Sequence, residues 1–227
     1  MKKLLVSLLT TSLLASCASS SFPELEQSTT YSGGELTDSS TRFYWSTETL
    51  TTPLTSADYV LNRDASWYKT DYLWSDGKLR ELIRHGETLG RSNNLVSFNL
   101  QLRFDQNNQA IYQHYVVGGQ VLPLNEQQLA SFPQQASHVE KTVKKQHSNR
   151  TELIQGVWNG KVFKSCDGKR YNKLELSNGL SISEQKSGQY VALVGKALGS
   201  TLLAKTLLKT EESSYSCITR PSYIKPQ

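Results

Sequence analysis

Apolar and polar residues alternate strictly from Val96 to Phe104, and this stretch constrains the fold more than any other part of the chain. Because successive side chains of a strand point to opposite faces, the alternation predicts a half-buried antiparallel strand. The same period of two recurs from about residue 42 to about residue 122, which predicts a sheet of several strands. The apolar positions of the clearest strand are Val96, Phe98, Leu100, Leu102 and Phe104.

Asp76-Gly77 predicts a hairpin within this sheet, because the pair suits a two-residue turn that requires positive φ. Counting outward from the turn places Trp74 opposite Leu79 and Tyr68 opposite His85. One face of the hairpin is then expected to carry Tyr68, Tyr72, Trp74, Leu79 and Ile83, and the other face Lys69, Asp71, Arg80 and Arg84 with Leu73 and Leu82.

A helix is predicted after a second hairpin turn at Gly118-Gly119. Asn125 and Gln128 have the spacing of a capping box at its start. Pro133 lies inside the helical pattern, which predicts a kink or two short helices. We expect the apolar stripe of this segment to cover one face of the sheet, and binding of a partner is the alternative. The stripe consists of Leu129, Phe132, Ala136, Val139 and Val143.

The first 17 residues have the pattern of a bacterial secretion signal. Met1-Lys2-Lys3 is basic, residues 4–14 are apolar, and small residues precede Cys17. The apolar run is shorter than the roughly 20 residues that span a membrane. The pattern resembles the bacterial lipobox, which implies that residues 1–16 are a signal peptide and that Cys17 is lipidated. An ordinary secretion signal is the alternative.

The residues after Cys17 indicate where the protein is anchored. Ala18, rather than Asp, follows the cysteine, so the resemblance implies the outer membrane with the protein facing the periplasm. Residues 17–40 are rich in Ser, Thr, Gly and acidic residues, and we predict a flexible tether. The first folded element is expected near residue 42. Removing Lys2 and Lys3 lowers the formal charge from +5 to about +3, which is too mild to indicate nucleic-acid binding.

Cys166 and Cys217 remain after the signal, and an even pair in the oxidising periplasm predicts a disulfide. A redox-active or metal-binding pair is the alternative. Short strands are predicted near residues 153–163, 171–176, 190–195 and 201–208, with Gly-containing turns between them. The predicted fold is therefore mainly β with a minor α part. Residues 41–150 form an antiparallel meander with a covering helix, and residues 151–227 form a small disulfide-stapled β-barrel or sandwich.

The ionisable residues indicate no established catalytic pattern. There is no Gly-x-Ser-x-Gly elbow, and the four histidines lack the short spacing of metal ligands. His85, with Glu87 two residues later, is the one histidine for which ligand binding or proton transfer is a hypothesis. Acidic residues also cluster in this hairpin, but solvated surface is the simpler interpretation. We therefore predict no catalytic residue, no metal site and no cofactor.

The aromatic residues of the first β unit are a stronger indication of function. A two-layer sheet of this size need not cover them all, and an uncovered aromatic face would be a recognition surface. The candidate binding surface consists of Tyr68, Tyr72, Trp74 and His85.

A set of dispersed motifs extends over residues 42–221. It includes Phe43-Tyr44-Trp45, residues 74–84, Val121-Leu122-Pro123-Leu124, residues 152–158, Phe163, Cys166, Gly168, Tyr190-Val191-Ala192, Cys217 and Arg220-Pro221. As a set, these motifs resemble the uncharacterised bacterial lipoproteins typified by YjaH. The resemblance implies a lipoprotein with the same cysteine pair, and it supplies no activity.

These observations favour a non-enzymatic binding or adaptor lipoprotein at the periplasmic face of the outer membrane. Its expected partners are membrane lipid, through Cys17, and an envelope protein. A lipoprotein that binds a small ligand or senses stress is the alternative, and an enzyme acting on the cell wall or on lipids is a third hypothesis.

Overall fold

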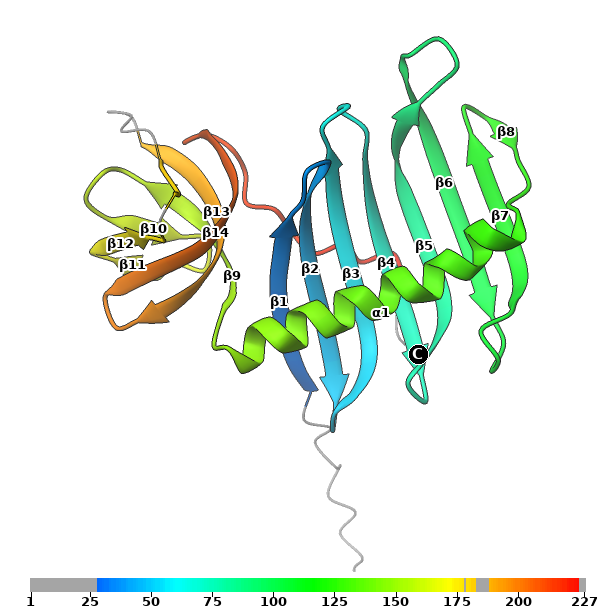
Figure 1. The fold of residues 1–227 in the computed structure, drawn as a ribbon, viewed down its shortest axis with the longest axis horizontal. Coiled ribbons are helices and arrows are strands. Elements are labelled where there is room, and N and C mark those ends of the chain that lie inside the picture. The colour runs from blue at the N-terminus through cyan, green and yellow to red at the C-terminus, as the bar shows by residue number, and fades with distance from the viewer. Residues whose placement is uncertain (1–27, 178, 183–187, 225–227) are drawn as a thin grey trace, which may run out of the picture.

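The computed structural model describes residues 28–177, 179–182 and 188–224, which form two sheets joined by one long helix (Figure 1). The first sheet has eight antiparallel strands in chain order, so the predicted meander is confirmed. Its strands are β1 (Ser28–Leu36), β2 (Ser40–Thr49), β3 (Thr52–Asn62), β4 (Trp67–Ser75), β5 (Lys78–Leu89), β6 (Leu95–Phe104), β7 (Ala110–Val117) and β8 (Gln120–Val121).

Strand β1 corrects the prediction of a tether that extends to residue 40. The strand begins at Ser28, well before the first folded element that was expected near residue 42, and it pairs with β2 from Ser28 opposite Thr49 to Leu36 opposite Thr41. Its composition is poor in apolar residues, so its order comes from this backbone pairing and from contact with the helix rather than from a large buried surface. Cys17 and the signal at residues 1–16 lie outside the described residues.

The helix α1 (Glu126–Ser148) lies across one face of the eight-stranded sheet (Figure 1). Asn125 and Gln128 form the predicted capping box. The helix continues through Pro133, so the alternative of two short helices is wrong. Four residues of the predicted stripe are buried against the sheet, and Leu129 packs beside them half-buried. The buried members are Phe132, Ala136, Val139 and Val143.

A β-bulge near the predicted turn changes the faces of the β4–β5 hairpin. The turn forms at Asp76-Gly77, and Trp74 lies opposite Leu79 as predicted, but Leu73 then pairs with Glu81. Arg80 is therefore an extra residue in β5, and such a bulge shifts the register by one beyond it. A one-residue shift moves each side chain of one strand to the other face. Tyr68 consequently lies opposite Gly86 instead of His85.

The second sheet has six strands in the order β11-β10-β9-β13-β14-β12 and curls into a nearly closed barrel-like shape. All its pairs are antiparallel except the parallel pair of β12 and β14. The first two predicted strands are each divided by a turn or bend. The strands are β9 (Glu152–Trp158), β10 (Phe163–Ser165), β11 (Arg170–Tyr171), β12 (Lys173–Leu176), β13 (Gln189–Leu198) and β14 (Thr201–Glu212).

The Cys166–Cys217 disulfide forms as predicted and joins the β10 hairpin to the residues after β14. From Cys217 the chain returns to the first sheet as a strap, residues 217–224, on the face opposite α1 (Figure 1). Arg220 donates hydrogen bonds to Thr47 and Thr55, and the backbone N–H groups of Tyr223 and Ile224 donate to Asp71. The strap therefore links the second sheet, through its disulfide, to the face of the first sheet opposite α1.

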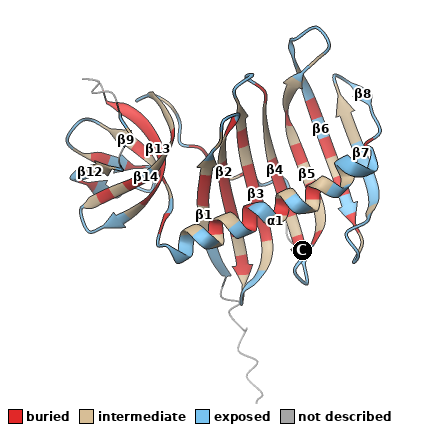
Figure 2. Ribbon diagram, viewed as in Figure 1, coloured by how far each residue is buried: buried red, intermediate tan, exposed pale blue. Residues whose placement is uncertain are grey.

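The two sheets also share a hydrophobic cluster. Phe43, Trp45 and Ala57 of the first sheet pack with residues of β13 and β14 and with Ile218 of the strap. Figure 2 shows that buried residues are concentrated in the central strands and in β13, whereas β7 and β8 are largely exposed. Strands β2 and β3 are thus covered on both faces, which makes them a rigid base for the side chains beneath α1.

Candidate ligand-binding cavity

Neighbouring strands place polar side chains in rows beneath α1. The register pairs Tyr44 of β2 with Asp58 of β3, Asp58 with Thr70 of β4, and Thr70 with Arg84 of β5. Because directly paired residues share a face of the sheet, all four side chains point toward the helix. The adjacent row on the same face contains Arg42, Val60, Tyr68 and Gly86.

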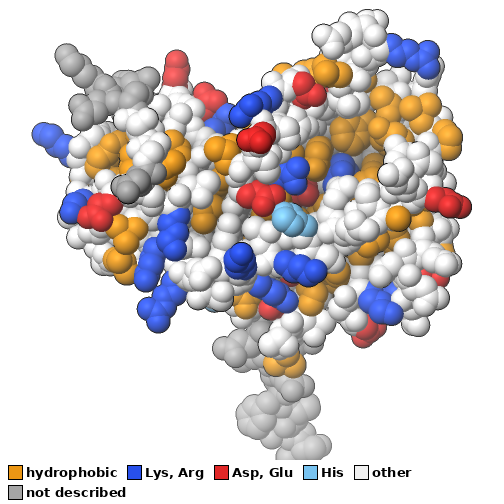
Figure 3. Space-filling model, in the orientation of Figure 1, with side chains coloured by type: hydrophobic (Ala, Val, Ile, Leu, Met, Phe, Trp, Pro, Cys, Tyr) orange, Lys and Arg blue, Asp and Glu red, His pale blue; other side chains and the backbone are white. Residues whose placement is uncertain are grey.

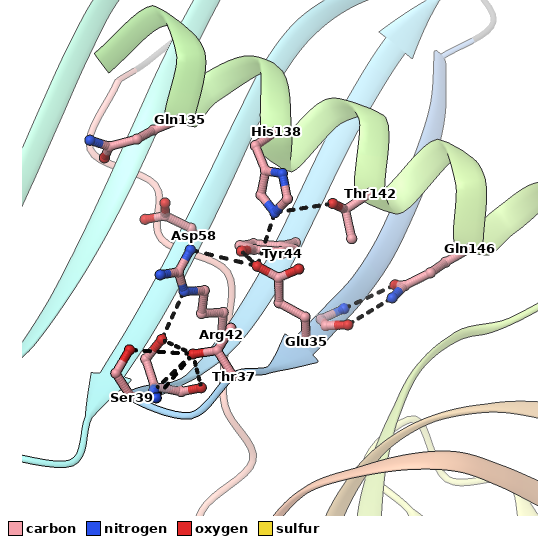
Figure 4. Close-up of polar contacts among 12 residues, drawn as sticks. Glu35, Thr37, Ser39, Arg42, Tyr44, Asp58, Gln135, His138, Thr142 and Gln146 are labelled. Carbon is pink, nitrogen blue, oxygen red and sulfur yellow. Dashed lines mark hydrogen bonds and ion pairs between the residues drawn. The ribbon is translucent and has the colours of Figure 1, made fainter. Parts of the chain in front are cut away.

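A cavity of about 450 Å³ lies between these rows and α1, which is within the usual size range of small-molecule sites. Figure 4 shows Gln135 and His138 projecting from the helix over the strands that carry Arg42, Tyr44 and Asp58. Figure 3 shows a hollow on this face of the molecule, with charged side chains near its middle and hydrophobic side chains toward β6 and β7. The lining consists of Arg42, Tyr44, Asp58, Tyr68 and Arg84 from the sheet and Ser131, Gln134, Gln135, His138 and Val139 from the helix.

Arg84 is a buried cation that lines this cavity. Its Nε donates to Thr70 Oγ1 at 2.7 Å, and its Nη2 donates to Tyr72 Oη at 3.2 Å and to Gln135 Oε1 at 3.0 Å. The guanidinium carbon lies 4.0 Å from the centre of the Tyr68 ring, a cation–π contact. Among the described residues, no carboxylate forms an ion pair with Arg84.

Asp58 is a buried carboxylate in the same cavity. Its Oδ2 accepts a hydrogen bond from Tyr72 Oη at 2.8 Å, so Tyr72 connects it to Arg84. Its Oδ1 is buried and has no hydrogen-bond partner among the described residues. Burial raises the pKa of Asp58, and the charge of Arg84, the nearby Thr70 hydroxyl and the hydrogen bond from Tyr72 only partly offset this effect.

Glu35 organises the side of the cavity next to β1. Its Oε1 accepts hydrogen bonds from Tyr44 Oη at 2.7 Å and from His138 Nε2 at 2.9 Å, and Arg42 Nη1 lies 3.6 Å away. Burial by itself would raise the pKa of Glu35, but these hydrogen bonds and the charges of His138 and Arg42 outweigh it and lower the pKa. Arg42 therefore has a carboxylate partner, whereas Arg84 has none among the described residues.

A second cavity of about 280 Å³ adjoins the first on the side of β6 and β7. The two share Tyr68, Arg84, Ser131 and Gln135 in their linings. Gly86 lies between Tyr68 and Phe98 in the register, and a Cβ there would lie 2.1 Å from the Trp67 carbonyl oxygen and 2.8 Å from Tyr68 Cβ. The glycine thus permits the close approach of β4 and β5 beside the cavity. The apolar and aromatic lining of the second cavity consists of Tyr68, Phe98, Leu100, Tyr115, Leu124 and Phe132.

The four residues predicted as a binding surface do not lie together. Tyr72 and Trp74 are buried in the core beneath α1, so neither belongs to an exposed surface. Tyr68 lines both cavities. His85 lies on the opposite face of the sheet, where its ring is 4.6 Å from that of Tyr223 and its Nδ1 contacts Asn99 Oδ1.

Arg84 and Asp58 are the site residues that the sequence interpretation missed. The sequence pattern predicts the opposite face of the hairpin for Arg84, because it contains no signal for the bulge at Arg80. Asp58 carries a usable signal, since a charged residue occupies the centre of an otherwise uncharged strand. Buried charges are rare unless they are paired or functional, so such a position indicates a site once the strand is recognised.

The described ranges contain no group of three or more His, Cys, Asp or Glu side chains that is arranged to hold a metal ion. Among the same residues, no helix combines the length and the apolar composition needed to cross a membrane. What the cavity offers is therefore a buried guanidinium, a buried carboxylate and an aromatic ring, which is an arrangement suited to binding a small polar molecule.

Fold and site together define a disulfide-stapled β-protein with a ligand-sized cavity between a long helix and a meander sheet. The chain belongs to the family described as "Protein of unknown function (DUF1481)", whose sequence model matches residues 32–222. The match begins within β1, in agreement with a folded region that starts before residue 42. Neither a curated protein nor a solved structure matches the chain.

Proposed function

We propose that this protein is a non-enzymatic lipoprotein of the bacterial cell envelope that binds a small polar ligand between α1 and the eight-stranded sheet. The observation that carries the proposal is the pair of incompletely matched buried charges, Arg84 and Asp58, in one cavity of about 450 Å³. A buried charge without a partner is costly, and such groups occur where a ligand completes the site.

The proposal includes the localisation of the protein and its lipid anchor. The lipobox-like sequence before Cys17 supports lipidation of that residue, and Ala18 supports the outer membrane with the folded part facing the periplasm. Globomycin treatment of cells should accumulate a precursor that retains residues 1–16. A Cys17→Ser variant should lose incorporation of labelled palmitate, and incorporation that persists in this variant would refute the anchor.

Ligand binding is tested by blocking the cavity from the helix without changing the buried charges. Ser131 lines both cavities from α1, so Ser131→Trp should fill the opening. Ala130→Trp is the matched control, because Ala130 is exposed at the neighbouring helix position. In a thermal-shift screen of small polar metabolites, we expect at least one compound to stabilise the full chain and Ala130→Trp but not Ser131→Trp. A screen in which no compound makes this distinction would overturn the proposal.

An adaptor role is a second candidate, and it is favoured by exposed apolar residues at the outer end of the first sheet. Ile111 and Val121 are each 68% exposed, and Tyr112 and Leu122 lie near them in the chain and are also exposed. Exposed apolar side chains at the end of a sheet are a candidate protein-binding surface. In-cell crosslinking should capture the same envelope protein with the parent chain but not with Ile111→Ser/Val121→Ser. Loss of binding that occurs only with Ser131→Trp would favour the ligand-binding role.

A further inference from the structure

We propose that the cavity binds the zwitterion of an α-amino acid that has an apolar side chain. The inference rests on the proposed ligand-binding function and adds the chemical class of the ligand. It follows from three requirements that meet at one place: an anion for Arg84, a donor for Asp58 and an apolar group for the adjoining cavity.

The first requirement comes from the guanidinium of Arg84. Its described hydrogen bonds use Nε and Nη2, and all of them go to uncharged oxygens of Thr70, Tyr72 and Gln135. Among the described residues, no carboxylate pairs with it, although it is buried. A carboxylate on the ligand would supply the missing charge, and arginine binds carboxylates strongly through charge-assisted hydrogen bonds.

The second requirement comes from Asp58 Oδ1, which is buried without a donor among the described residues. An ammonium group would satisfy both its hydrogen bond and its charge. Tyr72 Oη lies 2.8 Å from Asp58 Oδ2 and 3.2 Å from Arg84 Nη2, so one hydroxyl separates the two charged side chains. An α-amino acid carries its carboxylate and its ammonium on one carbon, and therefore matches this short separation.

The third requirement comes from the second cavity, which shares Tyr68 and Arg84 with the first. From this shared boundary the lining continues to Phe98, Leu100 and Phe132, all of which are buried. An apolar side chain placed there would remove its surface from water, the main source of affinity for such groups. The rest of the lining that this cavity does not share with the first includes the polar residues Asn62, Ser66, Glu87, Thr88 and Gln128. Glu87 accepts a hydrogen bond from Trp67 Nε1 at 2.8 Å.

Isothermal titration calorimetry with the full chain and a matched set of probes tests each requirement. L-phenylalanine has all three groups, L-phenylalaninamide lacks the carboxylate, N-acetyl-L-phenylalanine lacks the ammonium, and glycine lacks the side chain. We expect L-phenylalanine to bind, and each of the other probes to bind at least about tenfold more weakly, the effect of losing one charge-assisted bond or one buried apolar group. Ala130→Trp should bind L-phenylalanine like the parent chain, and Ser131→Trp should not.

The outcomes separate this inference from the proposed function. Equal binding of L-phenylalaninamide or N-acetyl-L-phenylalanine would overturn the zwitterion and leave a ligand-binding site. Equal binding of glycine would overturn the role of the second cavity. Failure of L-phenylalanine, combined with a screened compound that distinguishes Ser131→Trp from Ala130→Trp, would overturn the amino-acid class alone. Failure of both experiments would overturn the proposed function as well.

Discussion

The side-chain amide of Gln146 in α1 pairs with the backbone of Gly34 in β1 through two hydrogen bonds. Gln146 Nε2 donates to the Gly34 carbonyl at 2.7 Å, and the Gly34 N–H donates to Gln146 Oε1 at 3.0 Å (Figure 4). Because β1 is an edge strand, the amide occupies the position that another strand would take. Gly33 permits this approach, since a Cβ there would lie 2.0 Å from Oε1.

Replacing Gln146 with Ala should destabilise the protein by about 1–3 kcal/mol, because two part-buried backbone groups lose their partner. Urea denaturation of the full chain measures the change. Gln127→Ala is the control, since Gln127 is exposed on the same helix and Ala has a slightly higher helix propensity than Gln, so stability should rise by at most a few tenths of a kcal/mol. Equal stability of the two variants would contradict the role assigned to the Gln146–Gly34 pair.

The raised pKa of Asp58 predicts how Asp58→Asn changes stability with pH. A carboxyl whose pKa is raised on folding contributes most below its ordinary pKa, and this contribution is lost as pH rises through the folded-state pKa. The side-chain amide of the variant does not titrate. The free energy of unfolding of the variant, relative to that of the parent, should therefore increase from about pH 4 toward neutrality. The total increase should be about 1.4 kcal/mol for each unit by which folding raises the pKa of Asp58.

Urea denaturation of the parent and Asp58→Asn at a series of pH values tests this prediction. Asp71 and Glu140 also have pKa values raised by burial, but both remain in the variant, so they contribute equally to the two curves. A stability difference that is constant across the series would show that Asp58 has the same pKa in the folded and unfolded chain.

Removing the Cys166–Cys217 disulfide should lower the free energy of unfolding by about 4 kcal/mol in the chain-entropy model for a separation of 51 residues. The double variant Cys166→Ser/Cys217→Ser and reduction of the parent by dithiothreitol should give the same result. Denaturation midpoints that are insensitive to both changes would show that contacts of the strap, rather than the bond, hold residues 217–224 in place.

Asp71 should anchor the strap through its oxygen rather than through its charge. Asp71 Oδ2 accepts the backbone N–H groups of Tyr223 and Ile224 at 2.9 and 2.8 Å. Asp71→Asn keeps an oxygen acceptor and should preserve slow hydrogen exchange of these amides. Asp71→Ala should accelerate their exchange and destabilise the protein by about 1–3 kcal/mol. Fast exchange in both variants would instead assign the anchoring to the carboxylate charge.

Features set by nearby residues could be predicted from the sequence. The alternation before Phe104, the turn at Asp76-Gly77 and the capping box at Asn125 depend on short-range geometry, and the structure has all three. The disulfide followed from the number of cysteines. The strand at residues 28–36 escaped prediction because its order comes from pairing with β2 and from Gln146, a residue more than a hundred positions away.

The site depends on relationships that no local pattern contains. Arg84 and Asp58 meet only because β3, β4 and β5 have one particular register, and a single extra residue at Arg80 determines which face Arg84 occupies. The same shift moved His85 away from Tyr68 and so removed it from the predicted binding surface. Alternation predicts which residues of a strand share a face, but it does not predict where a bulge moves the following residues to the other face.

The strap links the folding of the first sheet to the last residues of the described chain that are synthesised. Strands β1 to β5 are synthesised early, yet the buried Asp71 in β4 receives its donors from Tyr223 and Ile224, about 150 residues later in the chain. Ile218 likewise completes a cluster begun by Phe43. The first sheet therefore cannot reach its final packing until almost all of the described chain has been synthesised. A chain that is interrupted earlier would leave the carboxylate of Asp71 without its two backbone donors and the hydrophobic cluster around Phe43 without Ile218.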